Sequence, residues 1–94
     1  MLTLMLAAFA VAQTADALTF YQMISAGGTE ANPIVQWLYD GHVAAPALAK
    51  AAVTLGVAGI LPHLGYRLGL AVLSFGLLAA AVGTLSNLAT LEAL

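Results

Sequence analysis

The sequence predicts an all-α integral membrane protein with three transmembrane helices and a short interfacial helix between the first two. Of its 94 residues, 63% are hydrophobic and only 6% are charged, whereas soluble domains carry about 25% charged residues. Three long apolar segments, 2–25, 44–62 and 66–90, have about the length that a helix needs to cross a bilayer. A chain of this length is expected to form one domain, residues 1–94. Its main partner is therefore the lipid bilayer.

The composition argues against several classes of function. The chain has two basic residues and a net charge of -2, which does not suit a nucleic-acid-binding surface. It has no Cys, so disulfides, thiol catalysis and cysteine metal sites are ruled out. Ser25, Ser74 and Ser86 lack a His/Asp arrangement for nucleophilic catalysis. His42 and His63 fall at opposite ends of the second span, too far apart to share a metal. We therefore expect no enzyme activity, no cofactor and no metal site.

The first span is predicted to cover residues 2–25. No Lys or Arg precedes this apolar run, so we expect a retained helix rather than a cleaved signal peptide, although Ala10-Val11-Ala12 resembles a cleavage site. Gly27-Gly28 should stop the helix, because glycine readily adopts the backbone conformation that ends a helix.

A short interfacial helix is predicted over residues 33–39. Asn32 is a good N-cap and Pro33 a good first helical residue, and Asp40-Gly41 should break the helix. The aromatic residues of the chain fit the belts found at membrane–water interfaces. They are Phe20, Tyr21, Trp37, Tyr39 and Tyr66.

The second and third spans are predicted at 44–62 and 66–90, because Pro46 suits the first turn of a helix and Pro62 its end. A tight turn is predicted over residues 64–67, at the start of the third span, and its Arg67 is the only basic residue in a loop. Basic loops tend to stay cytoplasmic. This predicts that the N-terminus and the turn at Arg67 lie inside, with the Glu30 loop and the C-terminus outside.

Small residues recur on each span at alternating steps of three and four. Such residues allow close approach of helices in lipid, where packing replaces the hydrophobic effect. We predict packing seams on all three spans. The seams contain Gly69, Leu73, Gly76, Ala80, Gly83 and Asn87 on the third span, Ala49, Ala52, Gly56, Gly59 and His63 on the second, and Ala8, Ala12, Ala15, Thr19 and Gln22 on the first.

Asp16 and Lys50 are ionisable residues in segments that are otherwise typical of membrane-spanning helices. A charge within such a helix usually faces a partner, a cavity or a pathway. Counting at 1.5 Å per residue puts both toward the membrane side that carries the Glu30 loop, together with Asn87 near the end of the third span. We expect Asp16 to accept from Lys50, with Asn87 as a bridge and Thr19 beside them. An alternative interpretation places the charged end of Lys50 in the headgroup region. The cluster would either fix helix register or mark a proton, ion or ligand path.

The order of the polar and loop residues in this chain resembles the pattern of a family of small prokaryotic integral membrane proteins of unknown function. The shared pattern is D-x-x-T…GG-x-E-x-N-P, followed by a Lys and a late Asn. It matches Asp16 and Thr19, then Gly27, Gly28, Glu30, Asn32 and Pro33, then Lys50 and Asn87. The resemblance implies about three spanning helices and a role for the same polar residues. It implies no established activity.

Two functions remain open at this stage. The first is a non-enzymatic structural or accessory subunit, in a prokaryotic inner membrane, that packs with itself or with a larger membrane complex through its Gly/Ala seams. The alternative is an oligomeric pore or carrier, including a holin-like protein. It is suggested by polar residues at steps of three on the first span: Gln13, Asp16, Thr19 and Gln22.

Overall fold

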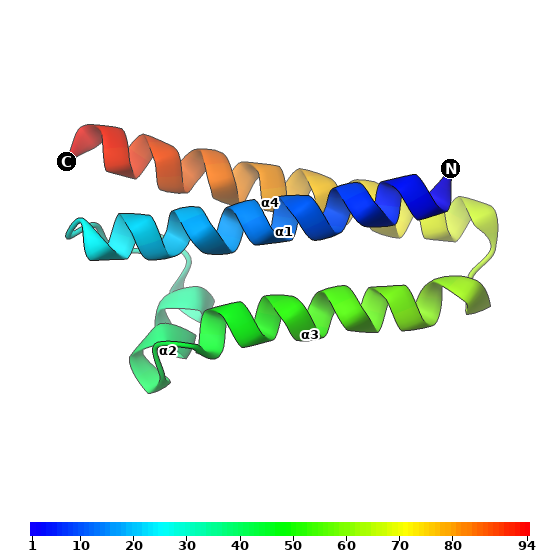
Figure 1. The fold of residues 1–94 in the computed structure, drawn as a ribbon, viewed down its shortest axis with the longest axis horizontal. Helices are drawn as coiled ribbons and strands as arrows, with labels where there is room; N and C mark the ends of the chain where they lie inside the picture. Colours follow the sequence, from blue (N-terminus) through cyan, green and yellow to red (C-terminus); the bar gives the residue numbers. More distant parts are fainter.

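The computed structural model covers residues 1–94 and is helical throughout, apart from short connections. The elements are α1 (Leu2–Ser25), α2 (Pro33–Gly41), α3 (Ala45–Ile60), the 3₁₀ turn η1 (Leu61–His63) and α4 (Tyr66–Ala93). The three long helices lie side by side, and α2 lies at one end (Figure 1). The segments Leu2–Ser25, Ala45–His63 and Tyr66–Ala93 are long and apolar enough to cross a membrane. The protein is thus an all-α, multi-pass membrane protein.

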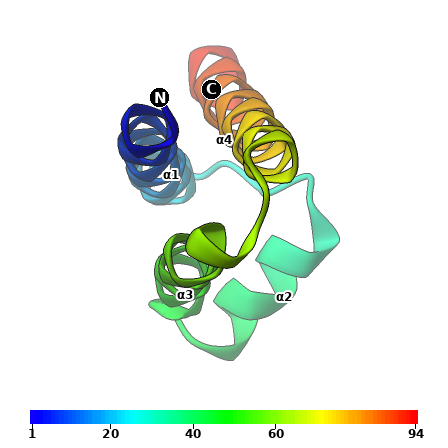
Figure 2. The ribbon, with the colours of Figure 1, turned by 90° about the vertical axis from the view of Figure 1, so that its right-hand side faces the viewer.

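Helices α1 and α4 run in the same direction, and α3 runs opposite to both (Figure 1). The N-terminus and the turn into α4 lie at one end, whereas the α1–α2 loop and the C-terminus lie at the other. The end-on view shows α1 beside α4, with α3 below α1 and α2 beside α3 (Figure 2). The first and last helices of the chain form the most extensive interface.

The C-terminus of α1 is closed by the glycine pair that the sequence singled out. Gly27 has a φ of 95°, a conformation that glycine adopts without a steric penalty. The N–H of Gly27 donates to the carbonyl of Ile24, and the N–H of Gly28 donates to that of Met23. These two bonds form a Schellman motif. Gly28 also packs tightly on Met23, since a Cβ at Gly28 would lie 2.6 Å from the sulfur of Met23.

Helix α2 begins as the sequence predicts and ends slightly later. The Asn32 side chain accepts from the N–H of Ile34 at 3.0 Å, and Pro33 is the first helical residue. The helix continues through Gly41, so Asp40-Gly41 does not break it earlier. A hydrogen bond of 2.8 Å from Gln36 Nε2 to Asp40 Oδ1 joins adjacent turns and supports this last turn.

Large side chains of α1 fill the gaps that glycines leave on α4. Three glycines spaced seven residues apart on α4 each face a residue of α1, and those residues are also seven apart. Residues between the glycines are buried in the same interface, with Leu73 fully inaccessible. Two parallel helices with a seven-residue repeat keep the same faces together along their length. The facing pairs are Leu2–Gly69, Phe9–Gly76 and Asp16–Gly83.

The seam predicted on the first span is correct only in part, because Thr19 contacts Asn87 of α4 while large residues fill most of the interface. Ala8 and Gln22 are exposed, while the buried residues of α1 are Phe9, Asp16, Phe20 and Met23. The physical reason is size complementarity. A groove made by glycines is filled by large side chains, because a second row of small residues would leave voids.

The seam predicted on the second span does not form within this chain. A Cβ at Gly56 or Gly59 would meet no atom within 4 Å, and both residues are exposed together with Ala52 and His63. Helix α3 instead packs on α1 through its opposite face. At its end, Leu61 is buried in a small core with Phe9 and Leu73.

Candidate functional site

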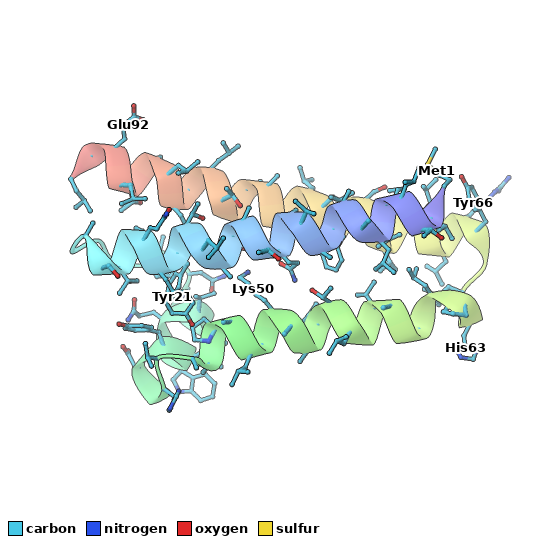
Figure 3. The ribbon with its side chains drawn as sticks, in the orientation of Figure 1. Met1, Tyr21, Lys50, His63, Tyr66 and Glu92 are labelled. Atoms are coloured by element: carbon cyan, nitrogen blue, oxygen red, sulfur yellow. The ribbon has the colours of Figure 1, made fainter.

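The polar cluster of Asp16, Thr19, Lys50 and Asn87 joins all three spans. Asp16 is only 8% exposed at the centre of this cluster. Its Oδ2 accepts from Lys50 Nζ on α3 at 2.5 Å, and its Oδ1 accepts from Asn87 Nδ2 on α4 at 3.1 Å. The predicted Asp16–Lys50 contact is therefore present, and Lys50 points from α3 toward α1 (Figure 3).

The amide of Asn87 is surrounded by acceptors on α1. Its nitrogen donates to the backbone carbonyl of Asp16 at 3.1 Å, to Asp16 Oδ1 at 3.1 Å and to the hydroxyl of Thr19 at 3.0 Å. An amide has only two N–H groups, so at least one bond is shared. The opposite amide orientation would place an oxygen against a carboxylate. The surroundings therefore require a donor at this position.

Hydroxyl groups complete the hydrogen bonding of the cluster. Thr19 donates to the carbonyl of Ala15 at 2.8 Å while it accepts from Asn87. Thr54 donates to the carbonyl of Lys50 at 2.8 Å, one turn further along α3. No fully buried side-chain nitrogen or oxygen lacks a partner. This matters because an unpaired polar group is costly in an apolar medium.

Gly83 provides the space that Asp16 needs. A Cβ at Gly83 would lie 2.7 Å from both carboxylate oxygens of Asp16, a distance that real side chains do not tolerate. The last glycine of the α4 seam and the polar cluster thus form one site. The sequence identified both features but did not connect them.

The Glu30 pocket is a cavity of about 450 Å³ that leads to the polar cluster from the α1–α2 loop. Glu30 and Asn32 of the loop line it, as do Asp16, Lys50 and Asn87 of the cluster. Apolar side chains from α1, α2 and α4 complete its wall, and they include Phe20, Val35, Ala80 and Val82. The loop motif and the intramembrane residues therefore belong to one continuous surface.

A second cavity of about 490 Å³ lies between α1 and α3. Its lining is more apolar and includes Leu18, Tyr21 and Leu55. Gln13 and Lys50 line both cavities. Lys50 thus separates two recesses at the α1–α3 interface, and only the Glu30 pocket contains carboxylates.

The loop motif is held by hydrogen bonds to its own backbone. Glu30 Oε1 accepts from the N–H of Asn32 at 2.9 Å, and the N–H of Glu30 donates to Gln36 Oε1 at 3.4 Å. These bonds place Glu30 above the start of α2. Lys50 and Asp16 form the one ion pair of the chain, so the Glu30 carboxylate has no cationic partner.

Two aromatic residues have roles that the sequence did not indicate. Phe20 was expected at the interface, but it is 2% exposed and packs edge-on against Tyr21 and Tyr39. The hydroxyl of Tyr21 donates to the carbonyl of Val43 at 2.6 Å and accepts from the N–H of Ala47 at 3.3 Å. Tyr21 thereby satisfies a backbone group at the start of α3 that no helical carbonyl reaches.

The structure gathers no group of three His, Asp or Glu side chains that would hold a metal ion. His63 lies in the turn before α4, and His42 follows the end of α2, where its Nδ1 accepts from the N–H of Ala44 at 3.0 Å. No family model, no curated protein and no solved structure matches this chain.

Proposed function

We propose that the protein is a non-enzymatic structural or accessory subunit of a prokaryotic inner membrane, which packs with itself or with a larger membrane complex. The family resemblance supports the prokaryotic setting. The polar cluster supports the structural role, because its groups find their partners inside the chain and join all three spans. Such a cluster stabilises one arrangement of the helices.

The observation that carries the proposal is the open face of α3. Ala52, Gly56, Gly59 and His63, here called the α3 stripe, follow the same alternating spacing as the seam that packs on α4. No side chain of the chain covers the glycines of the stripe. Large exposed residues flank it, including Leu48, Leu55 and Ile60. A row of small residues between large ones is the surface on which helices associate in lipid.

Cysteine crosslinking in native membranes tests this assembly, because the chain has no Cys of its own. Under mild oxidation, Gly59→Cys should give a disulfide-linked dimer if two copies pack through the α3 stripe. In a mixed complex, a photoreactive crosslinker attached to the same thiol should give a larger adduct. Leu78→Cys is the matched control, since Leu78 is an exposed apolar residue on α4. A protein that stays monomeric with Gly59→Cys, or that crosslinks equally through Leu78→Cys, contradicts the proposal.

A second pair of variants separates assembly from folding. Gly56→Leu and Ala52→Leu, each made in the Gly59→Cys background, add bulk to the α3 stripe, where a Cβ at Gly56 meets no atom of the chain and Ala52 is exposed. They should abolish the crosslinked species without lowering the unfolding temperature in detergent. A loss of stability would place the stripe in the fold rather than in an interface.

The second candidate function is an oligomeric pore or carrier, including a holin-like protein. The observation in its favour is the Glu30 pocket, which connects the membrane end at Glu30 with the Asp16–Lys50 pair. Liposomes that contain the protein would show an ion or solute flux that Asp16→Ala abolishes. Liposomes without flux at any pH would discard this candidate.

A further inference from the structure

We propose that the Glu30 pocket binds a small organic cation of the quaternary ammonium or phosphonium class. This inference goes beyond the proposed function, and it does not require the α3 stripe to be an interface. It rests on the size of the pocket, on its walls and on the charges that line it.

The volume of the pocket suits an organic molecule. Its ~450 Å³ falls within the range of about 300–1,000 Å³ found for sites of small molecules. A bare metal ion would leave most of this space empty and would lack ligands, because no third carboxylate or His is present. Apolar walls from Phe20, Val35 and Val82 favour a ligand with hydrocarbon surface.

The charge of the lining favours a cation. Two carboxylates, Asp16 and Glu30, and one ammonium group, Lys50, line the pocket, so its formal charge is -1. Lys50 and Asp16 compensate each other at 2.5 Å, which leaves Glu30 as the uncompensated charge. An organic cation beside Glu30 would neutralise the pocket, whereas an anion would add to its charge. Apolar walls strengthen this discrimination, because charge interactions are screened less there than in water.

Equilibrium dialysis of the protein in lipid nanodiscs tests the proposal with two probes of similar size and opposite charge, tetraphenylphosphonium and tetraphenylborate. Empty nanodiscs give the partition of each probe into lipid. We expect saturable binding of tetraphenylphosphonium above this background and none of tetraphenylborate. Absence of saturable phosphonium binding, or equal binding of the borate, would overturn the proposal.

The variant Glu30→Gln should weaken phosphonium binding by about tenfold, which corresponds to about 1.4 kcal/mol. Glu92→Gln is the matched control, because it removes the same charge at the same end of the molecule (Figure 3) but lies outside the pocket. Equal affinities of these two variants would show that the site is elsewhere.

A second pair of variants tests the position of the ligand without a change of charge. Ser86→Leu adds volume to the wall of the pocket, and Ser74→Leu makes the same change at an exposed position of α4 away from it. Only Ser86→Leu should reduce binding. The unfolding temperature of each variant identifies one that fails to fold. Crosslinking through Gly59→Cys is independent of this experiment, so failure of the assembly and failure of the pocket are distinguishable.

Discussion

At the scale of single residues, Asp16 concentrates the interactions that hold the three spans together. It accepts from Lys50 on α3 and from Asn87 on α4, and both donors lie within the membrane-spanning region. In a bilayer these groups have few other partners, since lipid chains neither donate nor accept hydrogen bonds. Removal of one member therefore leaves the other unpaired, which costs more than the loss of a contact at a water-exposed surface.

A double-mutant cycle measures this dependence. Asp16→Asn and Lys50→Met should each lower the unfolding temperature in detergent, and the double variant should recover part of the loss. We expect an interaction energy of about 0.5–3 kcal/mol, the range found for residues in direct contact. Strictly additive effects would show that the two side chains do not depend on each other.

Asn87 offers a test of hydrogen-bond direction. Asn87→Asp replaces a donor by an acceptor opposite the Asp16 carboxylate and the Thr19 hydroxyl. It should destabilise the fold by at least about 1–3 kcal/mol, the cost of leaving buried polar groups unsatisfied. The matched control is Asn32→Asp, because either residue caps a helix well and Asn32 needs only an acceptor. Equal stability of the two variants would contradict the donor role of Asn87, and a chemical-denaturation curve in detergent gives the comparison.

At the scale of the elements, the glycines of α4 leave recesses along the helix, and side chains of α1 fill them. The recesses differ in depth. A Cβ at Gly69 would lie 3.3 Å from Leu2, whereas one at Gly76 would lie 2.7 Å from the ring of Phe9. The tightest positions are therefore in the middle of the span and at the polar cluster. Helix α3 has no such fit and is held to α1 by the Lys50 and Tyr21 side chains and by Leu61.

Alanine substitutions at the glycines of α4 and α3 should show these differences in packing. Gly76→Ala and Gly83→Ala should each destabilise the fold by about 1–3 kcal/mol, because extra volume in a packed interface forces neighbours apart. Gly69→Ala should cost less, because the tip of Leu2 can move by a few tenths of an ångström. Gly56→Ala is the control, since its added Cβ meets nothing, and a gain in helix propensity is its only expected effect. A uniform response across these four positions, measured by thermal unfolding, would refute these differences in packing.

At the scale of the whole molecule, the two ends of the bundle differ in character. The Glu30 loop, α2 and the C-terminus share one end, and the turn into α4, whose first residues include Arg67, shares the other end with the N-terminus (Figure 1). Trp37 is 72% exposed on α2, as expected for a residue at a membrane–water interface. The bundle thus has one end with an interfacial helix and a pocket, and one end with a short basic turn.

Single cysteine substitutions determine on which side of the membrane each end of the bundle lies. With no native Cys, His63→Cys reports the end of the Arg67 turn, and Glu92→Cys reports the opposite end (Figure 3). We expect a membrane-impermeant thiol reagent, added outside, to label Glu92→Cys and not His63→Cys, because basic turns stay cytoplasmic. The reverse pattern would invert the orientation, and labelling of both would contradict the three-span topology.

Sequence reasoning located most boundaries because the residues that end helices act locally. Gly27-Gly28 and Asn32-Pro33 determine their backbone geometry through bonds to residues at most five positions away. The α4 seam was also recognisable, because three glycines at a constant spacing define a face. The Asp16–Lys50 contact followed from the cost of an isolated charge in lipid.

The remaining features depend on what each face meets, which periodicity alone does not specify. Spacing shows that Gly56 and Gly59 share a face but not whether a helix of the same chain covers it. It likewise did not show that large residues of α1, such as Phe9, would face the glycines of α4. The bonds of Tyr21 to the start of α3 join residues more than twenty positions apart, and no local pattern encodes them.

The parallel pairing of α1 with α4 has a consequence for biogenesis. The ribosome makes α1 long before α4, so the main interface of the bundle forms only after α4 has been synthesised. During that interval Asp16 enters the membrane without its later partners. Lys50 reaches it with the second span, and Asn87 reaches it only with the third. The order of synthesis is thus also the order in which the carboxylate acquires its partners.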